Sequence, residues 1–212
     1  MGVLNKHLKK YLLLLCTPLT LCASGCNLVR MSSLVSSSIP FPKVPYTSTY
    51  EQKSDTDKIS YVTVSSNGNG YMLQISKGDK DTCSIFDNVD KKMYFFNLVN
   101  KSVESWPLQY VATPWMYDEG LYKASPFVGK QIEEQTVDGR RCNVWLFEND
   151  RSKTRTKSYF DKETGCLVLS NYESSGKSGI QRLTKYSPTS MPASAFQIPD
   201  DYKLTIMGSH TL

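Results

Sequence analysis

The fold class is decided by the stretch from Val128 to Glu148, which reads VGKQIEEQTVDGRRCNVWLFE. Residues 128–137 and 141–148 are two runs of strand length, and the dipeptide Asp138-Gly139 lies between them. An Asp-Gly pair in this position is typical of the tight turn of a β-hairpin. The stretch therefore predicts two adjacent antiparallel strands.

The second strand of this hairpin is apolar on both of its faces. Val144 and Leu146 point to one side of a strand, whereas Trp145 and Phe147 point to the other. A strand that is apolar on both faces is covered on both. One of these sides faces either an ordinary packed core or an apolar cavity, and the sequence leaves both alternatives open.

The rest of the chain from Tyr46 onward also consists of short runs rich in β-branched and aromatic residues. The further predicted strands are residues 59–64, 71–75, 82–86, 93–96, 155–160, 166–172 and 180–186, with turns at 67–70, 78–81 and 162–165. Short strands with regular turn signals predict an all-β sheet or barrel. Helical signals are weak, and only residues 115–124, between Pro114 and Pro126, favour a short helix.

The first 25 residues have the features of a secretory signal peptide. Lys6, Lys9 and Lys10 precede an apolar run at residues 11–21, which is too short to span a membrane. The small residues Ala23, Ser24 and Gly25 follow. We therefore expect residues 1–25 to be an export signal and not part of the folded domain.

The junction Ala23-Ser24-Gly25-Cys26 resembles the bacterial lipobox, in which a cysteine receives a lipid and becomes the new N-terminus. Residues 26–45, rich in Ser and Pro, have the composition of a flexible tether that would hold a domain away from a bilayer. Cys26 is therefore the predicted lipidation site, and Asn27 after it favours the outer over the inner membrane of the cell envelope. Plain secretory cleavage, which would give a soluble secreted protein, is the alternative.

The charge of the chain excludes one class of partner. The full sequence has 25 basic and 20 acidic residues, but the predicted signal peptide removes three lysines and no acids, which leaves a net charge of +2. Basic and acidic residues alternate along the chain without the basic stripe that nucleic-acid binding needs. We expect no nucleic-acid partner and no cofactor.

Three cysteines remain after Cys26, namely Cys83, Cys142 and Cys166. Three thiols allow one bridge, and a bridge between Cys142 and Cys166 would close a loop of about 25 residues, worth roughly 3 kcal/mol. Three small buried thiols are an equally good interpretation. The spacing of the cysteines does not fit a zinc site or a thioredoxin-like motif.

The residues needed for common catalytic machinery are missing from the predicted domain. The chain has two histidines. His7 lies in the signal peptide, and His210 is the third residue from the C-terminal end. The adjacent carboxylates Glu133-Glu134 and Asp200-Asp201 are interpreted as solvated surface, because neighbouring side chains in a strand point apart. We expect the chain not to be an enzyme.

A bulky apolar cluster at residues 114–117 is the most prominent candidate contact region. Trp115, Met116 and Tyr117 lie there between turn-forming residues. An exposed cluster of this type could contact a lipid or a partner protein. The alternative, a loop folded over the open sheet as part of the core, is favoured because large aromatic residues are mostly buried.

The order of motifs in the C-terminal half resembles the periplasmic lipoprotein-carrier (Lol-type) superfamily and its lipoprotein relatives. The relevant motifs are Val137-Asp138-Gly139, Asp161-Lys162-Glu163-Thr164-Gly165 and the closing segment 196–202, FQIPDDY. The resemblance implies a mainly β fold, namely a curved antiparallel half-barrel meander with one or two short helices covering the concave face. In the carriers, that face holds the acyl chains of a lipoprotein.

These observations together give the expected organisation and function. We expect a single half-barrel domain at residues 46–206, a disordered tail at 207–212, and a lipid-anchored envelope lipoprotein that binds an acyl or other apolar group. The candidate contacts for such a ligand, or for a lipoprotein partner, are Trp115, Met116, Tyr117, Trp145 and Phe147. The alternative is a structural or surface-interaction lipoprotein, or a soluble ependymin-like protein, with a filled core.

Overall fold

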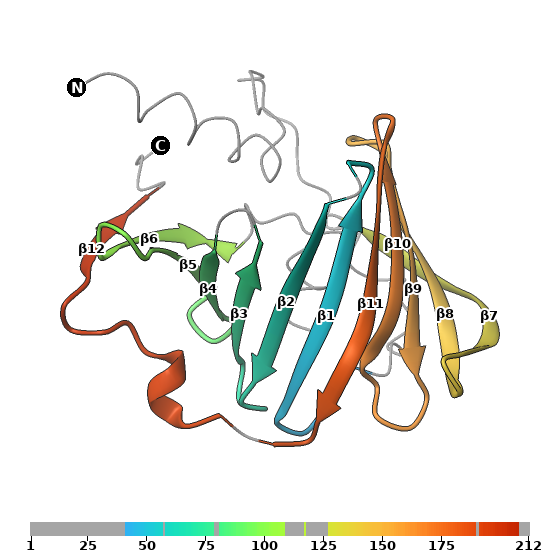
Figure 1. Cartoon of the computed structure of the whole chain (residues 1–212), viewed down its shortest axis with the longest axis horizontal. Helices are drawn as coiled ribbons and strands as arrows, with labels where there is room; N and C mark the ends of the chain where they lie inside the picture. Colours follow the sequence, from blue (N-terminus) through green and yellow to red (C-terminus); the bar gives the residue numbers. More distant parts are fainter. Residues whose placement is uncertain are drawn as a thin grey trace, which may run out of the picture.

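The fold is seen in a computed structural model (Figure 1), which describes residues 41–56, 58–78, 81–108, 117, 127–189 and 191–207. The predicted signal peptide, Cys26 and most of the predicted tether lie outside the described residues. So do Trp115 and Met116, and the predicted helix at 115–124 except for Tyr117. In the described part, no helix is long and apolar enough to cross a membrane.

Twelve strands form one open sheet, which confirms the predicted mainly β, curved and largely antiparallel architecture. The strands are β1 (Tyr46–Ser54), β2 (Ile59–Ser66), β3 (Tyr71–Lys77), β4 (Thr82–Asp87), β5 (Lys92–Asn97), β6 (Ser102–Pro107), β7 (Val128–Val137), β8 (Arg140–Asn149), β9 (Thr154–Asp161), β10 (Leu167–Ser174), β11 (Lys177–Ser187) and β12 (Lys203–Ile206). One 3₁₀ helix, η2 (Ala193–Phe196), precedes β12.

The sheet is built from two meanders joined at a central seam. The strand order is β12-β6-β5-β4-β3-β2-β1-β11-β10-β9-β8-β7. Strands β1–β6 form one arm and β7–β11 form the other, and the antiparallel pair β1–β11 joins them. β12 returns to the far edge and pairs in parallel with β6. Figure 1 shows the two arms curling away from this seam.

The turn signals in the sequence match the observed turns. Asp138 and Gly139 have φ angles of 50° and 76°, the double positive φ that a two-residue hairpin turn requires. Gly165 has a φ of 73° in the turn between β9 and β10. An added Cβ at Gly139 would meet no atom within 4 Å, so the backbone conformation and not space explains this glycine.

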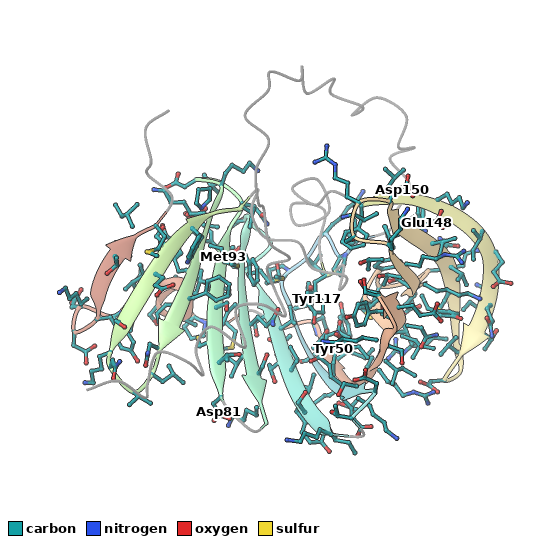
Figure 2. All side chains as sticks on the ribbon, turned by 90° about the horizontal axis from the view of Figure 1, so that it is seen from above. Tyr50, Asp81, Met93, Tyr117, Glu148 and Asp150 are labelled. Carbon is teal, nitrogen blue, oxygen red and sulfur yellow. The ribbon has the colours of Figure 1, made fainter. Side chains whose placement is uncertain are left out.

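The inner face of the sheet carries the largest buried cluster, which we call the inner core. It combines side chains from both arms with four residues from segments outside the strands, namely Phe41, Leu108, Tyr117 and Phe127. Its members on the strands are Tyr46, Tyr50, Val62, Val64, Met72, Phe86, Met93, Trp145, Phe147, Phe160 and Leu167. Figure 2 shows Tyr50 and Tyr117 between the two arms, which carry Met93 and Glu148.

Phe41 changes the predicted start of the domain. Its ring lies 5.3 Å from that of Phe160 in an edge-to-face arrangement, and only 7% of the residue is exposed. The end of the predicted tether therefore belongs to the folded domain. At the other end, the backbone N–H of Met207 still donates to the carbonyl of Ser105, whereas residues 208–212 lie outside the described part.

The one described helix, η2, packs on the outer face of the sheet, whereas the helix predicted to cover the concave face lies outside the described residues apart from Tyr117. Phe196 of η2 packs on Leu73 and Ile85 on the outer face of β3 and β4. Residues 191–202, which we call the outer strap, continue across this arm, and Tyr202 meets the ring of Phe96 at 5.6 Å. The residues FQIPDDY thus hold the C-terminal segment against the outer face, because their aromatic side chains complete a second core.

Candidate ligand-binding face

The two aromatic residues predicted on β8 lie in the inner core as expected from their alternation. Trp145 and Phe147 are 2% and 0% exposed, and their rings stack at a centroid distance of 6.2 Å. Phe147 meets Phe160 of β9 edge-on at 6.3 Å. These three rings form a wall on the concave side of the β7–β11 arm.

The opposite face of β8 is covered at Val144, as the sequence predicted, whereas Leu146 on the same face is half-buried. Val144 is fully buried in a separate cluster with Tyr159 and Leu169 on the outer side of the same arm. β8 therefore separates two cores, and the inner one is the candidate binding face because it contains the aromatic wall.

Tyr117 enters the inner face from the segment that connects the two arms. Its hydroxyl donates to Gln181 Oε1 at 3.1 Å and accepts from Gln181 Nε2 at 2.9 Å. Its backbone carbonyl accepts from the hydroxyl of Tyr46 at 3.2 Å. We call this arrangement the tyrosine latch. Tyr117 is 2% exposed, so this residue fits the core alternative and not an exposed contact.

The latch is electrically neutral over the whole physiological range. Burial raises the pKa of Tyr117 far above its ordinary value of 10.0, although the bond from Gln181 acts in the opposite direction. Burial also raises the pKa of Tyr50, whose ring lies 5.5 Å from that of Tyr117. Both phenols therefore keep their protons, and they act as neutral hydrogen-bonding groups.

A row of polar side chains crosses the inner face beside the aromatic wall. Strand register places Trp145 opposite Ser158, Ser158 opposite Ser170, Ser170 opposite Gln181, and Gln181 opposite Gln52. The row, which we call the polar belt, thus runs over five adjacent strands. Its members on β9, β10 and β11 have no exposed surface.

Most of the belt is satisfied by hydrogen bonds within it. The hydroxyls of Ser158 and Ser170 are 2.8 Å apart, and Gln52 Nε2 donates to Gln181 Oε1 at 2.7 Å. Gln181 also holds the tyrosine latch, so the belt and the latch form one buried network. Such networks stabilise a unique arrangement only when each member has a partner.

The belt has an unsatisfied end on β8 and β9. Trp145 Nε1 and Thr156 Oγ1 are buried and have no hydrogen-bond partner among the residues that the structure describes. Thr156 is opposite Phe147, so the hydroxyl lies one step along β9 from Ser158 of the belt. A buried polar atom without a partner costs about 1 to 3 kcal/mol, and native proteins rarely retain one without a reason.

The sequence analysis did not identify this belt. Ser158, Ser170 and Gln181 resemble ordinary surface residues when each is considered alone. The available signal was the alternation in β9, because Arg155 and Lys157 must face water and so direct the intervening hydroxyl groups inward.

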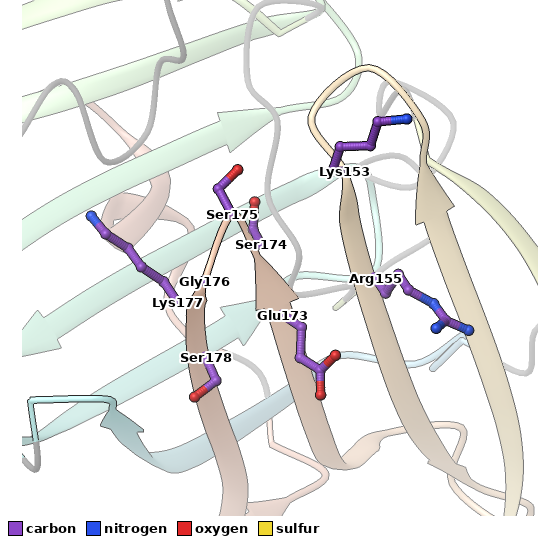
Figure 3. A pocket seen from close by; sticks show the side chains of 8 residues that line it. All are labelled: Lys153, Arg155, Glu173, Ser174, Ser175, Gly176, Lys177 and Ser178. Carbon is purple, nitrogen blue, oxygen red and sulfur yellow. The ribbon is translucent and has the colours of Figure 1, made fainter.

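Two pockets among the described residues lie away from the inner core. The larger, of about 380 Å³, lies between two hairpin ends and is lined by Lys153, Arg155, Glu173, Ser174, Ser175, Gly176, Lys177 and Ser178. Figure 3 shows its charged side chains on neighbouring strands. Arg155 is already paired with Glu148 at 3.1 Å. This pocket is polar and open, and it does not provide the apolar hollow that an acyl chain needs.

The smaller pocket, of about 200 Å³, lies beside the β7–β8 turn. Asp161 accepts there from Arg140 Nη1 at 2.7 Å and from the hydroxyl of Thr164 at 2.8 Å. The backbone groups of Asp161 also form hydrogen bonds in the turn between β9 and β10. The contacts of Asp161 therefore hold two hairpins together. The Asp161–Arg140 pair therefore has a structural role.

The two cysteines proposed as a disulfide are free thiols in the structure. Cys142 is opposite Asp161, and the N–H of Asp161 donates to the carbonyl of Cys166, so β9 separates the two cysteines. Two strand spacings are about 9 to 10 Å, whereas a disulfide needs Cα atoms within about 7 Å. This register does not support the predicted bridge. Burial raises the pKa of Cys142 to about 11, so the thiol is a poor nucleophile.

The paired carboxylates do not form an acid–base site. Glu133 bonds to Lys157 and Glu134 bonds to Lys162, each at 2.7 Å on the exposed surface. Asp201 is paired with Lys101 at 2.5 Å. In the described ranges, no group of three His, Cys, Asp or Glu residues is placed to hold a metal ion.

Comparison with known proteins gives no match by sequence and many by structure. Neither a protein-family model nor a curated protein matches the chain. The structure of PNGF-II has a TM-score of 0.50 and 10% identity, with 78% of this chain and 31% of that chain covered. A LolA-superfamily protein from Nitrosomonas europaea has a TM-score of 0.42 and 10% identity, over 75% and 92% of the two chains. Lipoprotein LppX from Mycobacterium tuberculosis has a TM-score of 0.35 and 8% identity, over 66% and 85%.

These structures are similar to the chain in fold alone, as their low identities require. The chain spans about a third of PNGF-II, so the likeness concerns one part of that protein. LolA-superfamily and lipoprotein structures are among those that it resembles in fold.

Proposed function

We propose that the chain is an exported, lipid-anchored protein of the bacterial cell envelope that binds an acyl or other apolar chain on its inner face. One observation carries the proposal. The aromatic wall of Trp145, Phe147 and Phe160 lines the concave side of an open sheet, and the described residues that cover it come from segments outside the strands. A second sheet does not close this side in the described residues.

Two features support the apolar nature of the ligand. The inner core is dominated by aromatic, methionine and aliphatic side chains, and Met72 and Met93 provide the adaptable surface that flexible apolar ligands favour. The sheet that carries the wall is also curved around this face (Figure 1 and Figure 2).

Export and anchoring rest on the N-terminal sequence. The signal-peptide features of residues 1–25 and the cysteine at position 26 support an acylated N-terminus. Each buried CH₂ group of an acyl chain adds about 0.8 kcal/mol to membrane affinity, so two or three chains would hold the protein on a bilayer. Intact-mass measurement of the full chain after export from a bacterial host tests this part, and Cys26→Ser is its control.

Ligand binding is tested with the full chain extracted in a mild detergent. We expect an organic extract of the purified protein to contain an acyl compound, and we expect a fluorescent long-chain acyl ester to bind the protein after that compound is removed. Phe147→Ala should weaken probe binding about tenfold or more, because it removes the centre of the wall. Phe147→Leu, which retains apolar volume, should weaken it less.

Phe196→Ala is the matched control, because Phe196 is also buried but lies on the outer face. It should lower the stability of the protein and leave the affinity for the probe unchanged. Equal losses of affinity in both phenylalanine variants would contradict binding at the inner face.

A second function is favoured by a specific observation. Phe41, Leu108, Tyr117 and Phe127 already occupy the inner face, as the filled core of a structural or surface-interaction protein would require. Under this alternative, neither a co-purifying compound nor probe binding would be found. The same experiment therefore separates the two functions.

A further inference from the structure

We infer that the ligand of the inner face carries a neutral carbonyl group, as in an acyl ester or amide, which Trp145 and Thr156 recognise by hydrogen bonds. This inference rests on the proposed function and deepens it, because it assigns a polar subsite and a chemical class to the ligand. The site is the unsatisfied end of the polar belt on β8 and β9.

The first step of the argument is the position of the belt. A face that held only hydrocarbon would not need a row of buried Ser and Gln side chains, since each costs free energy when it leaves water. Ser158, Ser170 and Gln181 have no exposed surface, and they lie in the same face as the aromatic wall. The inner face is therefore built to receive both apolar and polar groups.

The second step is the difference between the two ends of the belt. At the β1–β11 end, Gln52 and Gln181 bond to each other, and Gln181 bonds to Tyr117. At the β8–β9 end, an indole N–H and a hydroxyl are buried without partners among the described residues. The hydroxyl of Ser48 on β1 is also buried without a partner in the described part of the chain. Trp145 and Thr156, in contrast, lie on the strands of the aromatic wall, beside Phe147, where an apolar chain would bind.

The third step concerns the chemistry of the missing partner. The indole N–H can only donate, so its partner is an acceptor, and the Thr156 hydroxyl can donate to the same kind of group. None of the belt side chains is charged. A buried carboxylate or phosphate would need a compensating positive charge, whereas the carbonyl of an ester or amide needs only such neutral donors.

The test compares two chain-matched probes on the full-length protein freed of co-purifying lipid. One is a long-chain fatty-acid methyl ester, and the other is the ether of equal length that lacks the carbonyl. Competition against the fluorescent acyl ester gives both affinities. We expect the wild type to prefer the ester, and we expect Trp145→Phe and Thr156→Val each to weaken ester binding roughly two- to tenfold without changing ether binding.

Trp106→Phe is the matched control. Trp106 lies on the inner face opposite Met93, but its Nε1 already donates to Glu104 at 3.2 Å. This substitution should leave the preference for the ester intact. A second readout is the stability of Thr156→Val without ligand, which should rise because the substitution removes a buried hydroxyl without a partner.

The outcomes separate this inference from the proposed function. Binding of neither probe to the wild type would overturn the proposed function and the inference with it. Binding of both probes with equal affinity, or an ester preference that persists in Trp145→Phe and Thr156→Val, would overturn the inference alone. The indole N–H resonance of Trp145 should shift on addition of the ester and not of the ether, and an unshifted resonance also counts against the inference.

Discussion

The inner and outer faces of the sheet are both covered, but by different means. The outer face of the β1–β6 arm is covered by the outer strap, a continuous segment held between β11 and β12 and filled by Phe196 and Tyr202. The inner face is covered by side chains such as Tyr117, which a neutral hydrogen-bond network holds in place. The difference teaches that the described outer cover is held by apolar contacts, whereas Tyr117 on the inner face is held by polar contacts as well.

Removal of the main apolar contact of the outer strap should have the largest effect. Phe196→Ala should lower the free energy of unfolding by about 3 to 5 kcal/mol, because a buried phenyl ring leaves a cavity on β3 and β4. Urea unfolding followed by circular dichroism measures this change. Tyr202→Phe keeps the ring contact with Phe96 and serves as the control. A loss below 1 kcal/mol in Phe196→Ala would show that this apolar contact does not hold the strap.

Disruption of the tyrosine latch should have an intermediate effect on stability. Gln181→Leu leaves the hydroxyl of Tyr117 and the amide of Gln52 without their partner, and the expected cost is about 1 to 3 kcal/mol. Tyr117→Phe removes only one hydroxyl and should cost less. The same unfolding experiment measures both variants. A greater loss in Tyr117→Phe than in Gln181→Leu would contradict the central place of Gln181 in the network.

The ion pair at the end of the outer strap should have the smallest effect. A hydrogen bond from Lys101 lowers the pKa of Asp201 below its ordinary value of 3.8. The stabilisation is therefore present above that value and is lost as the pH falls through the lowered pKa. Asp201→Asn should reduce the melting temperature slightly at neutral pH, and the two proteins should converge in acid or at high salt. Gln181→Leu should show no such convergence, because the latch is neutral.

The β7–β11 arm was largely predictable from the sequence because its signals are local. β7 has the predicted bounds, and β8 is one residue longer at each end than predicted. The strands β1, β6 and β12 were missed. β1 and β6 carry many polar residues, and β12 pairs with β6, a strand far away in sequence. The 3₁₀ helix η2 was not predicted, and its apolar contacts lie on the outer face.

The aromatic part of the candidate site was also predictable, whereas its polar part was not. Trp145 and Phe147 stand out because alternation alone assigns them to one face. The belt arises from the register of five strands, and the contact between Gln52 and Gln181 joins residues 129 positions apart. No local sequence pattern indicates a pairing between residues so far apart. Tyr117 was identified as part of an apolar cluster, but its role in a polar network depends on the same long-range pairing.

The seam between β1 and β11 has a consequence for how the chain reaches its fold. β1 is the first strand to be made, and its partner is complete only when residue 187 has been added. Contacts this distant in sequence form slowly, because a long loop must close before they contribute free energy. The edge of β1 in the first meander therefore stays unpaired until β11 has been synthesised. An unpaired strand edge can pair with a wrong strand during this time. We expect the rate-limiting step of folding to be the docking of the two arms, and the polar belt becomes continuous in that same step.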